Sequence, residues 1–368
     1  MRVALLYFPG EKLWRLFHKR EVNKIAHLRD DFLNQTNRGN FLESSGRITS
    51  MGQLPMAQKN NRLVIGLGVP RFVFRSGISV ESDVFFMFSR SVTEFGGNFI
   101  PLLDKVAINT NRDFRKSSID LLLIDGNIPI ERQPSIVQEL LESPIRRPPI
   151  LVHIGDIYFS QDGLEKLDYW VSNADHIVLH NSRVPTSYLN RFSILLWPFF
   201  PLPEKLYSLG KNNVNGDCLI LGSQHRQRNY FIDYARKRGV MIDDRSHSRS
   251  YQSKILNSYE EYIRTIREAK MLFTNGYINR KESIIVGRAG EAFLAETLLL
   301  YEKGSDLSFF FSEYKSYLPV RNVHDFVEKV SYINQHPEQA LKLTNHALFE
   351  FSENYSSDSF WQWVTSRI

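Results

Sequence analysis

Short apolar runs that alternate with helical patterns constrain the fold of this chain more than any other feature. Several of these runs end in Gly, Asp, His or Asn. The alternation favours α/β architecture with parallel sheets, because a parallel strand is reached through a crossover helix. Ligands bind such sheets at the carboxyl ends of the strands, so function is expected there. In the first half of the chain, strands are predicted over 3–8, 62–68, 84–89, 119–126, 149–156 and 176–182.

A proline-rich stretch divides the chain. Pro198, Pro201 and Pro203 do not allow a helix to continue, and a polar stretch with Gly and Asn follows them. A chain of 368 residues exceeds what one hydrophobic core usually supports, which favours two domains. The predicted division is an N-terminal domain over 1–200, a hinge over 201–216, a second domain over 217–355 and a closing helix over 356–368.

The second half repeats the alternation of strands and helices. Strands are predicted over 218–223, 240–244, 270–275 and 298–302, and helices over 226–239, 259–269, 322–335 and 337–351. The closing segment is rich in aromatic residues, among them Phe360, Trp361 and Trp363. These rings fit a helix that crosses back onto the first domain, and they fit plain core packing in the second domain equally well.

The charge balance admits several classes of partner. The chain carries 46 basic and 40 acidic residues, a net charge of +6, which suits phosphate-bearing ligands, nucleic acid or an anionic membrane surface. Cys218 is the only cysteine, which excludes an intramolecular disulfide framework and a cysteine-rich metal site. The N-terminus lacks the pattern of a signal peptide, and no apolar run reaches the roughly 18 residues that span a bilayer. We therefore expect a cytoplasmic protein, with membrane contact only at the periphery.

The stretch "GRAGEAFLAETLLLYEKG" over 287–304 carries the most informative chemistry. Arg288 and Glu291 fall on one helical face at i and i+3. At the start of a helix, free amides and an arginine attract phosphate, and a carboxylate one turn later suits a ribose diol. Such a pairing would recognise a nucleoside diphosphate, although the spacing by itself does not decide for this site. An intrahelical salt bridge between the two side chains is the alternative.

From Gly287 onward the sequence resembles the C-terminal domain of GT-B-fold glycosyltransferases, specifically the CgeB-like spore-maturation group related to the group 1 families. The matching parts are Arg288, Glu291 and the strand that ends at Glu302, followed by "LPVRNVHDFVEKVSYINQHPE" and "NYSSDSFWQWV". The resemblance implies two Rossmann-like αβα domains that face a central cleft, with the nucleotide sugar held by the second domain.

The resemblance also implies site residues in both domains. In "CLILGSQHRQR", Gly222 and Ser223 would form a turn, with Arg226 or Arg228 reaching the diphosphate; an exposed basic helix cap is the alternative. Arg288 would join them at the diphosphate, with Glu291 on the ribose. In "LVHIGDIYF", His153 and Asp156 would face the transferred sugar and the acceptor, although a structural histidine remains the alternative.

The sequence departs from the family pattern at two places. Retaining group 1 enzymes often carry two glutamates separated by seven residues. If Glu291 is the second, the first falls on Ser283, with Glu282 one residue out of register, and these two are the candidate donor-sugar contacts. Where the family usually has glycine after the helix, this chain has Glu296. A non-glycine residue in a left-handed turn costs about 1 kcal/mol.

The resemblance implies a metal-independent glycosyltransferase of the hexosyltransferase class. It would move a sugar from a nucleotide-diphosphate donor to a hydroxyl of a glycan, a protein or a modified nucleic acid, and would require no cofactor. No paired aspartates sit in a convincing metal site. Two alternatives stay open: a sugar-nucleotide epimerase or hydrolase, and a catalytically silent module with the same fold that binds polyanions through its basic surface. The oligomeric state is left open.

Overall fold

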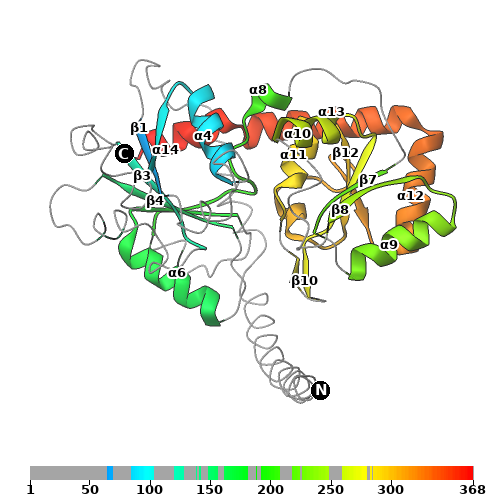
Figure 1. Cartoon of the computed structure of the whole chain (residues 1–368), viewed down its shortest axis with the longest axis horizontal. Coiled ribbons are helices and arrows are strands. Elements are labelled where there is room, and N and C mark those ends of the chain that lie inside the picture. The colour runs from blue at the N-terminus through cyan, green and yellow to red at the C-terminus, as the bar shows by residue number, and fades with distance from the viewer. Residues whose placement is uncertain are drawn as a thin grey trace, which may run out of the picture.

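The computed structural model describes residues 64–68, 84–102, 120–127, 138, 141, 148–155, 161–180, 188, 192–207, 218–223, 226–247, 259–279, 282–283 and 285–367. The strand predicted over 3–8 and the predicted site residue Asp156 lie outside these ranges. Two parallel sheets organise the described part of the chain (Figure 1).

The first sheet has six parallel strands in the order β2-β1-β3-β4-β5-β6. Burial of nearly every residue in β3, β4 and β5 explains why these strands read as continuous apolar runs. The helices α4 (Val84–Glu94) and α6 (Gln161–Asn173) accompany this sheet. The strands are β1 (Val64–Gly68), β2 (Asn98–Leu102), β3 (Leu121–Asp125), β4 (Ile150–Ile154), β5 (His176–Leu179) and β6 (Ile194–Leu196).

The second sheet has five parallel strands in the order β13-β12-β9-β7-β8. They are β7 (Cys218–Ser223), β8 (Ile242–His247), β9 (Met271–Thr274), β12 (Leu298–Glu302) and β13 (Leu318–Val320), and a short antiparallel pair, β10 (Tyr277–Asn279) and β11 (Glu282–Ser283), follows β9. Helices α9 (Arg226–Lys237) and α12 (Val323–Gln335) cover one face. Helices α10 (Tyr259–Arg267), α11 (Arg288–Leu294) and α13 (Pro337–Asn354) cover the other.

The last helix, α14 (Ser357–Thr365), returns to the first sheet (Figure 1). Its buried aromatic residues join a core cluster with Phe88 of α4 and with residues of β3, β4 and β5. Trp361 is fully buried, and its Nε1 donates a hydrogen bond to Ser91 Oγ at 3.1 Å. The predicted crossing of the closing helix onto the first domain is therefore confirmed.

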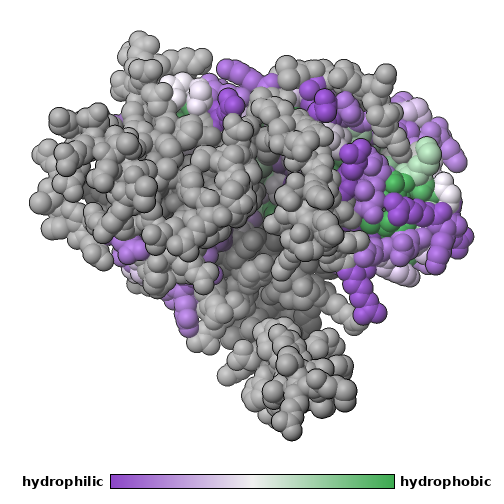
Figure 2. All heavy atoms as spheres, in the orientation of Figure 1, coloured by the Kyte–Doolittle hydropathy of each residue, from purple (hydrophilic) through white to green (hydrophobic). Residues whose placement is uncertain are grey.

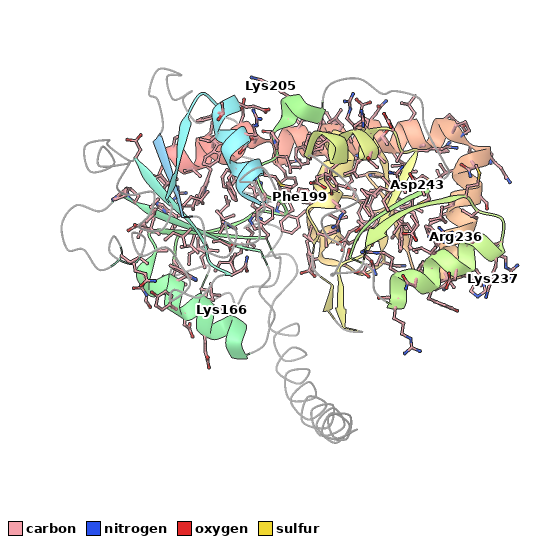
Figure 3. The ribbon with its side chains drawn as sticks, viewed as in Figure 1. Lys166, Phe199, Lys205, Arg236, Lys237 and Asp243 are labelled. Atoms are coloured by element: carbon pink, nitrogen blue, oxygen red, sulfur yellow. The ribbon has the colours of Figure 1, made fainter. Side chains whose placement is uncertain are left out.

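The proline-rich connection packs between the two sheets. Phe199 lies there (Figure 3), with ring centroids 6.2, 5.6 and 5.9 Å from Phe293, Phe311 and Phe351 of the second half. A Cβ added to Gly290 of α11 would lie 2.8 Å from the Phe199 ring, so this glycine permits close approach. After the connection comes the one-turn helix α8 (Glu204–Tyr207).

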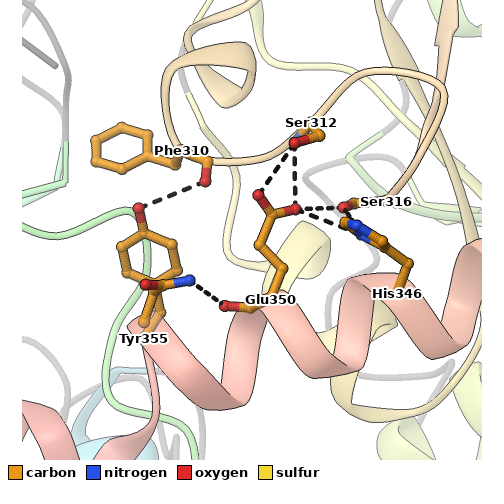
Figure 4. A network of polar contacts seen from close by, with 7 residues as sticks. Phe310, Ser312, Ser316, His346, Glu350 and Tyr355 are labelled. Atoms are coloured by element: carbon orange, nitrogen blue, oxygen red, sulfur yellow. Dashed lines mark hydrogen bonds and ion pairs between the residues drawn. The ribbon is translucent and has the colours of Figure 1, made fainter. Parts of the chain in front are cut away.

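A polar network holds the segment after the 3₁₀ helix η5 (Asp306–Phe309) onto α13 (Figure 4). The Glu350 carboxylate accepts hydrogen bonds from the Ser312 amide and hydroxyl, each at 3.2 Å, and from the Ser316 hydroxyl. Ser316 Oγ also lies 3.0 Å from His346 Nδ1. The network fixes α13 to the segment that leads from η5 into β13.

One predicted strand is wrong. Residues 84–89 form the start of α4 rather than a strand, because apolar residues continue at helical spacing through Phe88 and Val92, which both enter the core beside α14. An unbroken apolar run cannot by itself distinguish a strand from a buried helix. Among the described residues, no helix is long and apolar enough to cross a membrane.

Candidate functional site

Gly222 at the end of β7 makes room for the guanidinium of Arg288. Its φ is +100°, and a Cβ added there would lie 2.5 Å from Arg288 Nη2 and 2.6 Å from Arg288 Cζ. Any side chain at this position would displace the arginine. Glycine is therefore required both by the backbone conformation and by the close approach of a cation to the carboxyl end of the strand.

A second arginine lies beside the first. Arg228 of α9 is buried, and its Nη2 donates a hydrogen bond to Asn275 Oδ1 at 3.1 Å. Burial, and secondly the positive charge of Arg288, lowers the pKa of Arg228 to about 10. The guanidinium stays charged at neutral pH. Of the two arginines predicted to reach the diphosphate, Arg228 is the one beside Arg288, whereas Arg226 is exposed at the start of α9.

Arg288 and Glu291 do not pair with each other. No ion pair joins these two described side chains, and the Glu291 carboxylate accepts a hydrogen bond from the Tyr262 hydroxyl of α10. Arg288 Nε is buried, and no hydrogen-bond partner for it is found in the part of the chain that the structure describes. The alternative of an intrahelical salt bridge is therefore not what this helix forms.

The expected free amides at the start of α11 are only partly present. The amide of Ala289 donates to Val286 O at 3.0 Å, and that of Glu291 donates to Gly287 O at 3.2 Å. These two donors are already used. Positive charge in this region therefore comes from the guanidinium groups rather than from these amides.

The end of β12 fixes the loops that present these side chains. Tyr301 Oη accepts a hydrogen bond from the Val286 amide at 3.2 Å, just before α11. Glu302 Oε1 accepts one from the Gly276 amide at 3.0 Å, just after β9. Sequence reasoning did not assign a site role to Asn275, and it treated Glu302 only as part of the family pattern.

A pocket of about 440 Å³ adjoins this region on the side of α9 and α12. It shares Asn275 with the arginine pair, and Glu302 lies in its wall. The remaining lining residues are Gln227, Tyr230, Phe231, Phe273, Val320, Arg321, Asn322, Val323 and His324.

His153 of β4 is fully buried under Phe88 and Phe200, with ring centroids 4.9 and 5.4 Å away. Burial lowers its pKa to about 3, so the imidazole is neutral at pH 7. Burial raises the pKa of neighbouring Asp125 to about 6. Because Asp125 Oδ1 lies 4.0 Å from His153 Nε2 and the ring is neutral, we do not regard this contact as an ion pair. His153 is thus enclosed by aromatic rings in the core of the first sheet.

The other predicted positions are distributed as follows. Ser223 ends β7, and Glu282 and Ser283 form β11, paired with β10. Among the described residues, no group of three or more His, Cys, Asp or Glu side chains is arranged to hold a metal ion. Hydrophilic side chains cover the surface around α9 (Figure 2), where Arg226, Arg236, Lys237 and Arg238 are exposed.

Structural comparison identifies the architecture. An α-glucosyltransferase solved with UDP-glucose and DNA containing an abasic site is similar to this chain with a TM-score of 0.56 and 12% identity, over 83% of this chain and 99% of that one. HepE from Anabaena, solved with UDP-glucose, gives a TM-score of 0.53 and 10% identity, over 83% and 99% of the two chains. The chain has the GT-B fold.

A match to a protein-family model agrees with this fold. Residues 210–362 match a family model described as glycosyl transferase-like, which covers the GT-B lobe that holds the arginine pair. Among solved structures, TarM is similar with a TM-score of 0.48 and 10% identity over 67% of this chain, which spans 54% of the length of TarM; this match adds no argument. No curated protein sequence matches the chain.

Proposed function

We propose that the protein is a glycosyltransferase that moves a sugar from a nucleotide-diphosphate donor to an acceptor hydroxyl. The observation that carries this proposal is the pair of guanidinium groups, Arg228 and Arg288, gathered at the carboxyl end of β7 where Gly222 clears the space. Positive charge held close to the negative charge that develops on a leaving diphosphate usually makes a large contribution to catalysis. The glycosyl transferase-like match over 210–362 supports the same assignment.

The donor would lie against the second sheet, within the proposed domain over 217–355. Arg228 and Arg288 would hold the diphosphate, and Glu291, oriented by Tyr262, would accept hydrogen bonds from the ribose. Glu282 or Ser283 would contact the sugar. Two GT-B structures similar to this chain were solved with UDP-glucose, which favours a UDP-hexose donor and hence a hexosyltransferase. The CgeB-like subgroup is the closer family assignment that we propose.

The acceptor would lie at the carboxyl ends of the first-sheet strands. His153 is there, but a ring with a pKa of about 3 is a weak proton acceptor at pH 7. Because the neutral ring is buried under Phe88 and Phe200, its proposed role is to position the end of β4 from within the core, and Asp156 is the proposed proton acceptor. We propose a metal-independent reaction in the cytoplasm.

Ligand binding tests the donor site. With wild-type protein, UDP at 100 times its dissociation constant should add about 2.7 kcal/mol to the free energy of unfolding. Replacing Arg288 with Ala should remove the thermal shift, because the variant loses half of the cation pair. Arg236→Ala is the matched control, since Arg236 belongs to α9 but lies near its other end (Figure 3). An unchanged shift in the Arg288 variant would refute the site.

Product analysis separates the alternatives. A glycosyltransferase releases UDP and forms a new glycoside only when an acceptor is present, and DNA should be among the acceptors tried. An epimerase or hydrolase converts UDP-glucose without any acceptor. A catalytically silent module binds polyanions through the basic surface of α9 and leaves UDP-glucose intact.

A further inference from the structure

Asn275 is held in one orientation at the carboxyl edge of the second sheet. It directly follows β9, and the residue is 5% exposed. Its neighbour Gly276 donates its amide hydrogen to Glu302 Oε1 at 3.0 Å, so the end of β12 fixes the turn that carries Asn275. A side chain that is held in place in this way can fix the orientation of its hydrogen-bond partner.

The group that it contacts is the Arg228 guanidinium. Asn275 Oδ1 accepts the hydrogen bond from Arg228 Nη2 at 3.1 Å, and Asn275 Nδ2 lies 3.5 Å from Gln227 Oε1. The contact joins residues 47 positions apart, which is why spacing in the sequence did not indicate it.

The acceptor of this hydrogen bond is a neutral amide oxygen rather than a carboxylate. An amide oxygen accepts a hydrogen bond from arginine without adding negative charge. A carboxylate in the same place would form a stronger charge-assisted pair and would offset part of the positive charge. Burial lowers the pKa of Arg228 most, the repulsion of Arg288 lowers it further, and the attraction of the Asp244 carboxylate raises it. Aspartate here would relieve that repulsion, so a neutral partner keeps the positive potential of the arginine pair high.

We propose that Asn275 is a positioning residue, which aims the Arg228 guanidinium at the donor diphosphate and leaves its charge available to that ligand. This inference rests on the proposed function. It adds a determinant of anion affinity that does not itself need to touch the donor.

Asparagine and aspartate have nearly the same shape, so Asn275→Asp separates positioning from plain structural support. If Asn275 only stabilises the fold, aspartate should cost some stability, because it loses the 3.5 Å contact with Gln227 Oε1, but it should leave UDP affinity unchanged, because it still accepts the bond from Arg228. If Asn275 keeps the arginine charge available, Asn275→Asp should stay folded and lose affinity for UDP. Asn275→Ala should keep the charge and lose only the orientation.

The experiment is isothermal titration of the full chain with UDP at low and at high salt, beside thermal melting. We expect about a fivefold weaker Kd for Asn275→Ala, the size of one ordinary hydrogen bond. For Asn275→Asp we expect about a 30-fold loss and a smaller salt dependence, as for a hydrogen bond to a charged group. Asn334→Asp is the matched control, because Asn334 accepts a bond from Lys270 Nζ at 2.7 Å near the opposite edge of the sheet.

Three outcomes would count against the inference. Wild-type affinity in Asn275→Asp would overturn it, as would an equal loss in Asn334→Asp. If Asn275→Asp does not fold, Asn275→Ala decides alone, and unchanged UDP affinity there overturns the inference. Failure of the wild-type protein to bind UDP would instead contradict the proposed function, on which the role of Asn275 rests.

Discussion

Glu296 adopts a backbone conformation that normally belongs to glycine. It follows α11 with a φ of +52°. The Thr297 amide donates to Ala292 O at 2.9 Å and the Glu296 amide donates to Phe293 O at 3.2 Å, which is the hydrogen-bond pattern of a Schellman motif. The turn expected from the family pattern is therefore kept, although a left-handed conformation at a residue with a Cβ atom destabilises the fold.

Replacing Glu296 with Gly should raise the free energy of unfolding by about 1 kcal/mol, because the left-handed conformation is then free of strain. Chemical denaturation measures the change. Glu296→Ala is the control, since it removes the same charge but keeps the Cβ that causes the strain. A gain of equal size in the alanine variant would show that the charge, rather than the backbone, was responsible.

The site residues could be predicted from the sequence only in part. Arg288 was predicted from the spacing of an arginine and a glutamate one turn apart together with the resemblance to GT-B glycosyltransferases. Its contact with Gly222, and the contact of Arg228 with Asn275, depend on which strands become neighbours in the sheet. Spacing along the chain holds no information about that order, so Asn275 could not be found before the fold was known.

At the scale of elements, strands were predicted best where they are central and bounded by polar residues. The runs over 149–156 and 218–223 contain β4 and β7, which are buried between neighbouring strands. The run over 84–89 was assigned to the wrong class. The short strand β13 at the edge of the second sheet was missed, because three residues give no measurable period.

The helix α14 is anchored to the first sheet by a polar contact inside an aromatic cluster. Trp361→Phe should lower the free energy of unfolding by about 1–3 kcal/mol, because it leaves a small cavity and removes the bond from Nε1 to Ser91 Oγ. Urea unfolding measures the loss. Trp363→Phe removes the same volume from the same helix without this bond, and an equal effect of both changes would argue against the bond.

At the scale of the whole molecule, the carboxylates of Glu94 and Glu204 accept backbone hydrogen bonds close to where the chain crosses between the two sheets. Glu204 Oε1 of α8 accepts the Ser357 amide of α14 at 2.6 Å, and Glu94 Oε2 of α4 accepts the Lys205 amide at 3.2 Å. Burial is the main cause that raises the pKa of both glutamates, and the charge of Asp358 adds to it. These causes outweigh the hydrogen bonds that favour the ionised form.

The raised pKa of Glu204 fixes the sign of a pH effect. The folded protein binds this proton more tightly than the unfolded chain, so ionisation destabilises the fold as pH rises above the ordinary value of 4.5. Glu204→Gln keeps the oxygen that accepts from Ser357 and removes the charge. The variant should therefore melt above wild type at pH 7 and close to it at pH 4, as thermal scans across pH will show.

The control is Glu353→Gln, which changes an exposed glutamate of α13. We expect no pH-dependent gain from it. A lower melting temperature of Glu204→Gln at pH 7 would mean that the charge at the start of α14 is favourable after all, through the helix dipole.

The double crossing has a mechanical consequence. The chain passes between the sheets through the connection before α8 and again between α13 and α14, and the hydrogen bond from Ser357 to Glu204 ties the two passages together. Two connections that are tied together in this way define one line about which the two halves could rotate. We expect two such connections to resist a twist of one sheet against the other more than a rotation about the line that joins them, because a twist would strain both connections at once. Such a restraint would favour one alignment of the two halves.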